Sequence, residues 1–174
     1  MKLESTLNVV NRIYQTRNIA IINKRATPMK IIGQTRGHQH ICIFDKKSTV
    51  DYDGVYLGRA IFFDAKSVQT KTRFDLKNIE QHQYDYLSTV EKHGGIAFLL
   101  IGFEGSGELF FCSMSMIRHY WNEAKGGGRK SIPREAFEYE AMLVKDTGRA
   151  PMDYLACVDQ MIESIRERPG MLAE

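Results

Sequence analysis

Cysteines are few in this sequence, and their placement excludes two common structural devices. The 174 residues include three cysteines, Cys42, Cys112 and Cys157, which lie far apart and form no Cys-x-x-Cys pair. Neither a disulfide framework nor a cysteine-based zinc site is built from such a set. The pattern predicts a protein that works in a reducing cytoplasm.

Long apolar segments are also missing. The longest apolar run, residues 96–103, is far too short to span a bilayer, and the opening MKLEST lacks the apolar core of a signal peptide. The glycines at 126–128 do not precede a Lys-Ser/Thr pair at P-loop spacing, so nucleotide binding is not predicted. Because no repeat or low-complexity linker interrupts the chain, we expect one domain, residues 1–174, with no membrane partner.

The charge is unevenly distributed along the chain. Residues 1–50 carry nine Lys or Arg against Glu4 and Asp45, a net charge of +7, whereas the other 124 residues carry fifteen against nineteen, a net charge of −4. Such asymmetry favours a basic surface that binds a polyanion and is built from the first third of the chain. Solvated lysines scattered over one face are the alternative that the charge alone leaves open.

Apolar spacing predicts an α/β domain with a central mixed β-sheet flanked by helices. Helices are expected near the start of the chain, near 114–124, near 152–167, and in a segment that carries Leu76, Ile79, Tyr86, Leu87 and Val90 on one face and ends at Gly94 and Gly95. Strands are expected at 19–23, 51–58, 60–66, 96–103 and 108–112. The runs 29–32 and 40–44 predict a basic hairpin that projects from the domain.

Two carboxylates and a lysine give the sequence its chemical interest. Side chains two residues apart on a strand point to the same face, so Asp64 and Lys66 are expected side by side after the apolar residues 61–63. Asp51 on the neighbouring strand would bring a second carboxylate close by. Two carboxylates with open water positions suit Mg²⁺, which can polarise a phosphodiester and activate a water, and Lys66 would stabilise the developing charge.

Each of these residues also has a plain structural interpretation. A solvated Asp and Lys occur at the end of many strands, and Glu4 suits the positive end of the first helix dipole. His82, beside an apolar stripe, is expected to be a hydrogen-bonded structural histidine. Cys112 and Cys157 lie among apolar residues and are expected in the core.

The wider sequence context favours the catalytic interpretation. The segments STVDYDGVYLGR (48–59) and FFDAK (62–66) closely resemble the signature of RecU-type Holliday-junction resolvases, which belong to the restriction-endonuclease-like (PD-(D/E)xK) superfamily. The likeness covers the whole chain in the same order, with Leu3, Glu4, Asn8, Thr27 and Pro28 at the front and the segments 72–74, 82–83, 95–98, 120–121, 128–132, 150–151 and 153–154 further on.

The resemblance implies a restriction-endonuclease-like fold and a homodimer that resolves four-way-junction DNA by symmetric nicks with Mg²⁺, for which Mn²⁺ substitutes. It assigns the metal to Asp51, Asp64 and Ala65, makes Lys66 the catalytic lysine, and gives Glu4 and Thr49 supporting roles. Residues 29–47 become a stalk that enters the junction centre. The resemblance also implies that Lys30 and Arg36 contact phosphates and that Arg59 and Arg73 contact DNA. It implies a location in the bacterial cytoplasm, with branch-migration or recombination proteins as possible partners.

Several positions depart from the family pattern. Asp64 replaces the usual glutamate, Val50 stands where a threonine is common, the stalk is a few residues shorter, and a basic N-terminal tail is missing, all of which would suit a phage or prophage version. Two alternatives remain open: a nuclease of the same fold that cuts duplex or flap DNA, and a non-catalytic DNA-binding recombination accessory protein. A long basic arm argues against the first, and an intact Asp51, Asp64 and Lys66 cluster argues against the second.

Overall fold

A six-stranded mixed β-sheet organises the computed structural model, which describes residues 3–35, 37, 39–44 and 48–167. Its strand order is β1-β4-β5-β7-β8-β10, with β5 and β7 parallel and the remaining neighbours antiparallel. The strands span Ile21–Lys24 (β1), Tyr52–Tyr56 (β4), Arg59–Val68 (β5), Ile96–Phe103 (β7), Glu108–Ser113 (β8) and Met142–Leu143 (β10). The architecture is the predicted α/β class with a restriction-endonuclease-like fold.

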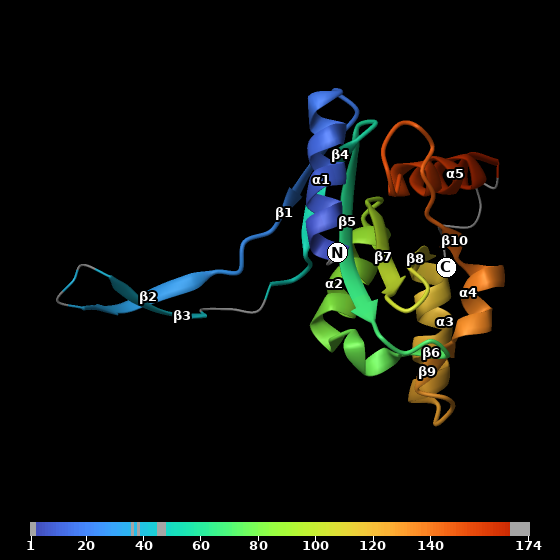
Figure 1. Ribbon diagram of the computed structural model, residues 1–174. Coiled ribbons are helices and arrows are strands. Elements are labelled where there is room, and N and C mark those ends of the chain that lie inside the picture. Colours follow the sequence, from blue (N-terminus) through green and yellow to red (C-terminus); the bar gives the residue numbers. More distant parts are fainter. Residues whose placement is uncertain (1–2, 36, 38, 45–47, 168–174) are drawn as a thin grey trace.

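Helices cover both faces of this sheet (Figure 1). Leu3–Thr16 (α1) and Tyr154–Glu167 (α5) pack on one face, and Gln81–Lys92 (α2), Met114–Lys125 (α3) and Arg134–Glu140 (α4) pack on the other. All eight residues of β7 are buried, alternating between the two cores, which confirms the prediction of a central strand covered on both faces. Within the described residues, no helix is long and apolar enough to cross a bilayer.

The β4–β5 hairpin is tight and determines which residues lie opposite one another. Leu57 and Gly58 both have positive φ, at 50° and 73°, as a two-residue hairpin turn requires. On β4, a Cβ at Gly54 would lie 2.0 Å from the Ile21 carbonyl oxygen, so only glycine lets β1 approach this closely. The resulting register pairs Tyr52 with Phe63 and places the residue before β4 beside the middle of β5.

The predicted projecting hairpin is present as a separate two-stranded sheet. Met29–Gln34 (β2) and His40–Phe44 (β3) pair antiparallel and extend away from the domain (Figure 1). Large apolar side chains of this stalk remain 47–58% exposed, because its two strands have no core to cover: Met29, Ile31, Ile32, Ile41 and Ile43. Cys42 is also exposed, whereas Cys112 and Cys157 are buried as expected.

The prediction that Leu76 and Ile79 belong to the same helix as Tyr86, Leu87 and Val90 was wrong. Leu76 belongs to a short 3₁₀ turn, Leu76–Asn78 (η1), and Ile79 is its C-cap, so α2 begins only at Gln81. The two side chains are buried against α2 without belonging to it, which explains why they fit its periodicity. Four short elements had no sequence signal strong enough to predict them: Arg73–Asp75 (β6), Ser131–Pro133 (β9), α4 and β10.

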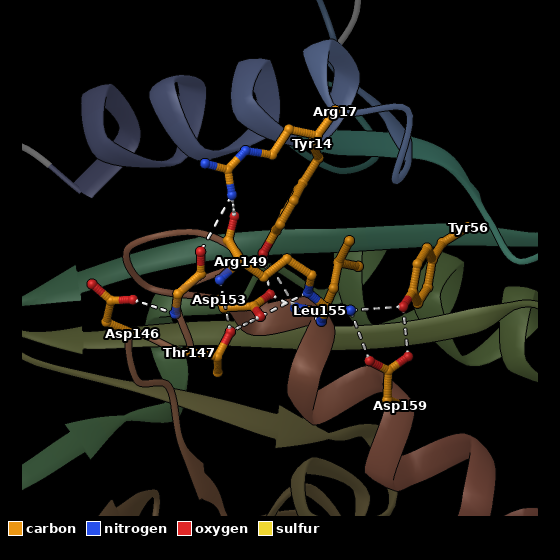
Figure 2. Close-up of polar contacts among 10 residues, drawn as sticks. Tyr14, Arg17, Tyr56, Asp146, Thr147, Arg149, Asp153, Leu155 and Asp159 are labelled. Atoms are coloured by element: carbon orange, nitrogen blue, oxygen red, sulfur yellow. Dashed lines mark hydrogen bonds and ion pairs between the residues drawn. The ribbon is translucent and has the colours of Figure 1, made fainter.

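A buried polar network joins α5 to α1 and β4 (Figure 2). The Asp153 side chain is 0% exposed, and it accepts hydrogen bonds from Tyr14 Oη at 2.7 Å and from Arg149 Nε at 2.8 Å. Arg149 continues to Tyr56 Oη and to Asp159, both at 3.0 Å. Met152, at φ 57°, interrupts the helical backbone, so α5 begins two residues later than expected.

Candidate active site

Strand β5 carries the predicted carboxylate and lysine on one face. Asp64 and Lys66 lie two residues apart, so the pleat directs both side chains to the same side. Asp64 Oδ2 lies 2.6 Å from Lys66 Nζ, with the Asp64 side chain 0% exposed and that of Lys66 20% exposed. The predicted juxtaposition is present, and the carboxylate is buried much more deeply than a solvated strand-end pair would be.

Asp51 meets Asp64 through two reciprocal backbone contacts. The Asp51 amide donates to Asp64 Oδ1 at 3.1 Å, and the Ala65 amide donates to Asp51 Oδ2 at 3.1 Å. Asp51 immediately precedes β4, so the register of the β4–β5 hairpin fixes both contacts. The two carboxylates are thereby held together even though like charges repel.

Gln83 is a site residue to which the sequence analysis gave no role. Its side-chain amide donates to Asp64 Oδ1 at 3.1 Å, and its Oε1 accepts from Lys66 Nζ at 3.0 Å. The same oxygen accepts from the Glu80 amide, since Gln83 is the third residue of the capping box that starts α2. The capping box therefore fixes a side chain that bridges Asp64 and Lys66. Its sequence signals were the Glu-x-x-Gln spacing and its place in the segment 82–83, which resembles the RecU family.

Arg25 is a second residue that sequence reasoning missed. Its guanidinium donates to Thr49 Oγ1 at 2.5 Å and pairs with Asp53 at 3.2 Å, while its amide donates to the Asp51 carbonyl at 2.8 Å. The guanidinium also lies 5.8 Å from the centre of the Tyr86 ring. Arg25 thus joins β1, the approach to β4 and α2, and it holds the segment that presents Thr49 and Asp51.

The electrostatics of Asp64 suit a bound cation. Burial, opposed by Lys66 and reinforced by Asp51, raises the pKa of Asp64 from 3.8 to about 6. Oδ2 is buried and accepts no well-aligned hydrogen bond from the described residues; its close charged neighbour is Lys66 Nζ. A carboxylate oxygen whose close partner is a single ammonium group keeps a second lone pair, which could bind a metal ion.

The donor set favours a hard cation that keeps its waters. Within the described part of the chain, no group of three or more His, Cys, Asp or Glu side chains is arranged to hold a metal. Asp51 and Asp64 could offer two carboxylates, and Ala65 could add only its backbone carbonyl. One or two carboxylates completed by water is the usual arrangement for Mg²⁺, whereas a structural zinc site needs four protein ligands.

A cleft of about 390 Å³ opens beside this pair. Asp51, Ala65 and Glu4 line it, together with Leu3, Lys24, Arg25, Thr27, Ser48, Tyr52, Ser67 and Glu104. Glu4 lines the cleft from α1, and its carboxylate forms an ion pair with Lys24. His82 hydrogen-bonds the Ser48 carbonyl at 3.0 Å, which agrees with the structural role expected for it.

The predicted DNA contacts are not gathered at this cleft. Lys30 lies on the stalk, and Arg36 lies outside the described residues. Arg59 starts β5 seven residues before Lys66, about 23 Å away at 3.3 Å per residue. Arg73, on β6, is exposed and paired with Asp75 at 2.9 Å.

Comparison with known proteins identifies relatives of this chain. The model of the Recombination protein U (RecU) family matches residues 1–160. The chain belongs to the RecU family. It is 36% identical over 166 residues to the Holliday junction resolvase RecU of Geobacillus kaustophilus, covering 92% of this chain and 83% of the relative. The RecU resolvases of Pediococcus pentosaceus (35% over 170 residues; 95% and 85% covered) and Bacillus cereus strain B4264 (36% over 166; 92% and 83%) are similarly related.

Proposed function

We propose that this RecU-family chain is a divalent-metal-dependent endonuclease that resolves four-way DNA junctions during recombination and repair. The observation that carries the proposal is the buried Asp64 carboxylate, held against Asp51 and Lys66 with one oxygen lacking an aligned donor. A protein that only bound DNA would gain nothing from this costly arrangement. Residues 1–174 act as one nuclease domain, with the stalk, 29–47, as an insertion.

Asp51, Asp64 and the Ala65 carbonyl would hold the ion, with Mg²⁺ preferred and Mn²⁺ a substitute. When bound, such an ion polarises a phosphoryl oxygen and lowers the pKa of a water molecule. Lys66 contributes a positive charge next to Asp64, where negative charge would develop on a phosphate held by the ion. Gln83 holds the Lys66 and Asp64 side chains in place relative to each other, because its amide group contacts both of them.

The stalk supports junction DNA as the substrate. It projects beyond the domain and carries exposed apolar side chains on both strands, an arrangement that a solvated hairpin would not favour. Lys30, with Arg36 beyond the described residues, would meet phosphates as the stalk enters the open centre of the junction. Arg59 and Arg73 are proposed as contacts with the surrounding DNA.

A homodimer would give the two active sites that paired nicks require. Cross-strand neighbours Ile21 and Val55 are 56% and 53% exposed on the face of β1 and β4 that turns away from α1, and Leu57 follows at 67%. Exposed apolar residues on an edge strand suit a closed two-fold interface. In this arrangement the two stalks lie side by side at the junction centre.

The cleavage experiment compares a mobile four-way junction with a linear duplex of matched sequence, with and without Mg²⁺. The proposal predicts metal-dependent cutting of the junction in symmetric pairs and little cutting of the duplex. Equal rates on both substrates would instead indicate a duplex nuclease of the same fold.

A cruciform plasmid tests whether two sites act in pairs. Wild type should produce linear DNA, whereas mixed dimers of wild type and Asp51→Asn should bind but leave mainly nicked circles. Linear product formed as efficiently by the mixed dimer would contradict the two-site model.

A further inference from the structure

We infer that a basic strip on the α2–α3 side of the domain, which begins next to the cleft and leads away from it, holds a duplex arm of the DNA. The strip consists of Lys71, Lys77, Lys125, Arg129 and Lys130, all exposed. The inference rests on the proposed nuclease function, and it adds a surface outside both the cleft and the stalk.

Strand pairing brings the strip together from separate parts of the sequence. β6 and β9 pair antiparallel, with Asp75 opposite Ser131, and the Leu76 amide donates to the Lys130 carbonyl at 3.1 Å. Lys77 in η1 therefore lies next to the 126–130 loop that carries Arg129 and Lys130. Lys125 is the last residue of α3 and Lys77 lies in η1, whereas Lys71, Arg129 and Lys130 lie in the short loops that flank β6 and β9.

The 126–130 loop is built compactly enough to cluster its charges. The Gly127 amide returns to the Ala124 carbonyl at 3.2 Å, and the Gly128 amide to the Glu123 carbonyl at 2.9 Å. Gly127 has φ 91°, which favours glycine, and a Cβ at Gly128 would lie 2.9 Å from the Glu123 carbonyl oxygen. The chain therefore turns directly after Lys125 and brings the two following cations beside the end of α3.

The cations of the strip differ from neighbouring arginines in their pairing. Arg73 pairs with Asp75, and Arg134 pairs with Glu108 at 2.6 Å and Glu138 at 3.2 Å. By contrast, the five members of the strip form no ion pair with any described residue, and Arg129 donates only to Ser131 Oγ at 3.0 Å. Five exposed cations without an ion-pair partner among the described residues suit a ligand with repeated negative charges.

Lys71 lies between the strip and the cleft, and this position indicates which ligand the strip binds. Its side chain lies over Gly105, where an added Cβ would be 2.8 Å from Lys71 Cε, and the adjacent Glu104 lines the cleft. The strip thus begins where the cleft ends and continues across β6 and β9. A DNA strand whose phosphate lies in the cleft would continue over these cations, so the ligand is the phosphate backbone of a duplex arm, recognised without base contacts.

The experiment measures binding as a function of salt concentration for the full-length Lys77→Gln, Arg129→Gln, Lys130→Gln variant, on a four-way junction and a linear duplex. Phosphate contacts contribute about 0.9 each to the slope of log affinity against log salt, so the slope should fall by about 3 per protomer. Affinity at low salt should fall by at least about tenfold on both substrates, with the junction-to-duplex ratio unchanged.

Two control variants keep the outcome specific. Arg12→Gln, Lys145→Gln, Arg166→Gln removes the same charge from exposed positions away from the strip and should leave the slope unchanged. Lys77→Arg, Arg129→Lys, Lys130→Arg retains the charges and should restore the wild-type slope. The inference is overturned if the salt slope is unchanged in the Lys77→Gln, Arg129→Gln, Lys130→Gln variant, or if the control variant with substitutions away from the strip loses as much slope. Failure of wild type to prefer or cut junctions would refute the proposed function instead, because the slope on linear duplex is measured independently.

Discussion

Asp64 and Asp153 are the two fully buried aspartates among the described residues, and their surroundings are opposite. Asp153 accepts from four donor atoms, so its charge is neutralised and its pKa is lowered by hydrogen bonds that outweigh burial; the donors come from Tyr14, Thr147 and Arg149. Asp64 is equally buried, but the pKa is raised to about 6, because burial outweighs Lys66 and Asp51 adds repulsion.

The difference separates a carboxylate that stabilises the fold from one kept for a ligand. Asp153 joins α5 to α1 through a complete set of partners and needs nothing more. Asp64 Oδ2 has the Lys66 ammonium as its close neighbour and no aligned hydrogen bond, and Asp51, which contacts Asp64, lines the cleft; a bound cation would complete this arrangement. Four predictions test the comparison.

Removal of the Asp64 charge should have the largest effect on cleavage. Asp64→Asn and Asp51→Asn are each expected to reduce junction cleavage at least about a thousandfold, since the ion and its activated water are lost. Junction affinity should stay within several-fold, because phosphate contacts elsewhere dominate it. Single-turnover cleavage and gel-shift titration measure the two quantities. Parallel loss of both in a folded variant would argue against the assignment.

Removal of the Asp153 charge should instead destabilise the fold. Asp153→Asn leaves Arg149 without its main counter-ion, and a broken buried pair costs about 3–5 kcal/mol in the free energy of unfolding. Cleavage per folded molecule should be unchanged at a temperature where the variant is folded. Asp159→Asn, at a site that is 34% exposed, provides a milder control. A catalytic defect without loss of denaturant stability would contradict this division of roles.

In the metal-free protein, the two aspartates should make the free energy of unfolding depend on pH in opposite directions. The pKa of Asp64 is about 6 when folded and 3.8 when unfolded, so ionisation opposes folding. The protonated Asp64 therefore contributes about 3 kcal/mol to the free energy of unfolding, for a pKa difference of about two. This contribution is present below pH 3.8 and is lost as the pH rises through 6. The lowered pKa of Asp153 means that its contribution is present above pH 3.8 and lost on acidification.

Denaturant unfolding with a chelator present measures this pH effect. The free energy of unfolding of Asp64→Asn should rise relative to that of wild type by about 2 kcal/mol between pH 4 and pH 7. Parallel stability curves for the two proteins would show that burial of Asp64 carries no such cost.

A smaller kinetic effect is expected at Arg25. Lysine cannot contact Thr49, Asp53 and Tyr86 simultaneously, so Arg25→Lys should lower kcat about tenfold, or about 1.4 kcal/mol, with KM within twofold. Arg17→Lys is the matched control, since Arg17 bonds the Gly148 and Arg149 carbonyls far from the cleft. A rise in KM at constant kcat would mean that Arg25 binds DNA directly.

Sequence patterns predicted the parts of the site that depend on local geometry. Alternation along β5 places Asp64 beside Lys66, and a two-residue hairpin turn brings Asp51 opposite, so both followed from period and spacing. The β7 core strand and the stalk hairpin were likewise predicted from continuous or alternating apolar residues.

Contacts that depend on tertiary packing could not be predicted in this way. Gln83 reaches the site because α2 packs against β5, and Arg25 because β1 pairs with β4. Leu76 and Ile79 fitted a helical period only because burial against α2 imposes the same apolar character. The β6–β9 pairing joins segments about sixty residues apart and had no local signature.

Direct binding of Mn²⁺ to the DNA-free protein, followed by electron paramagnetic resonance, tests the central claim most directly. Wild type and Asp159→Asn should each bind the ion with the same affinity at one site per protomer, and Asp64→Asn should not bind at that site. Equal binding by wild type and Asp64→Asn would contradict the account, because the buried carboxylate would then have no part in holding the metal.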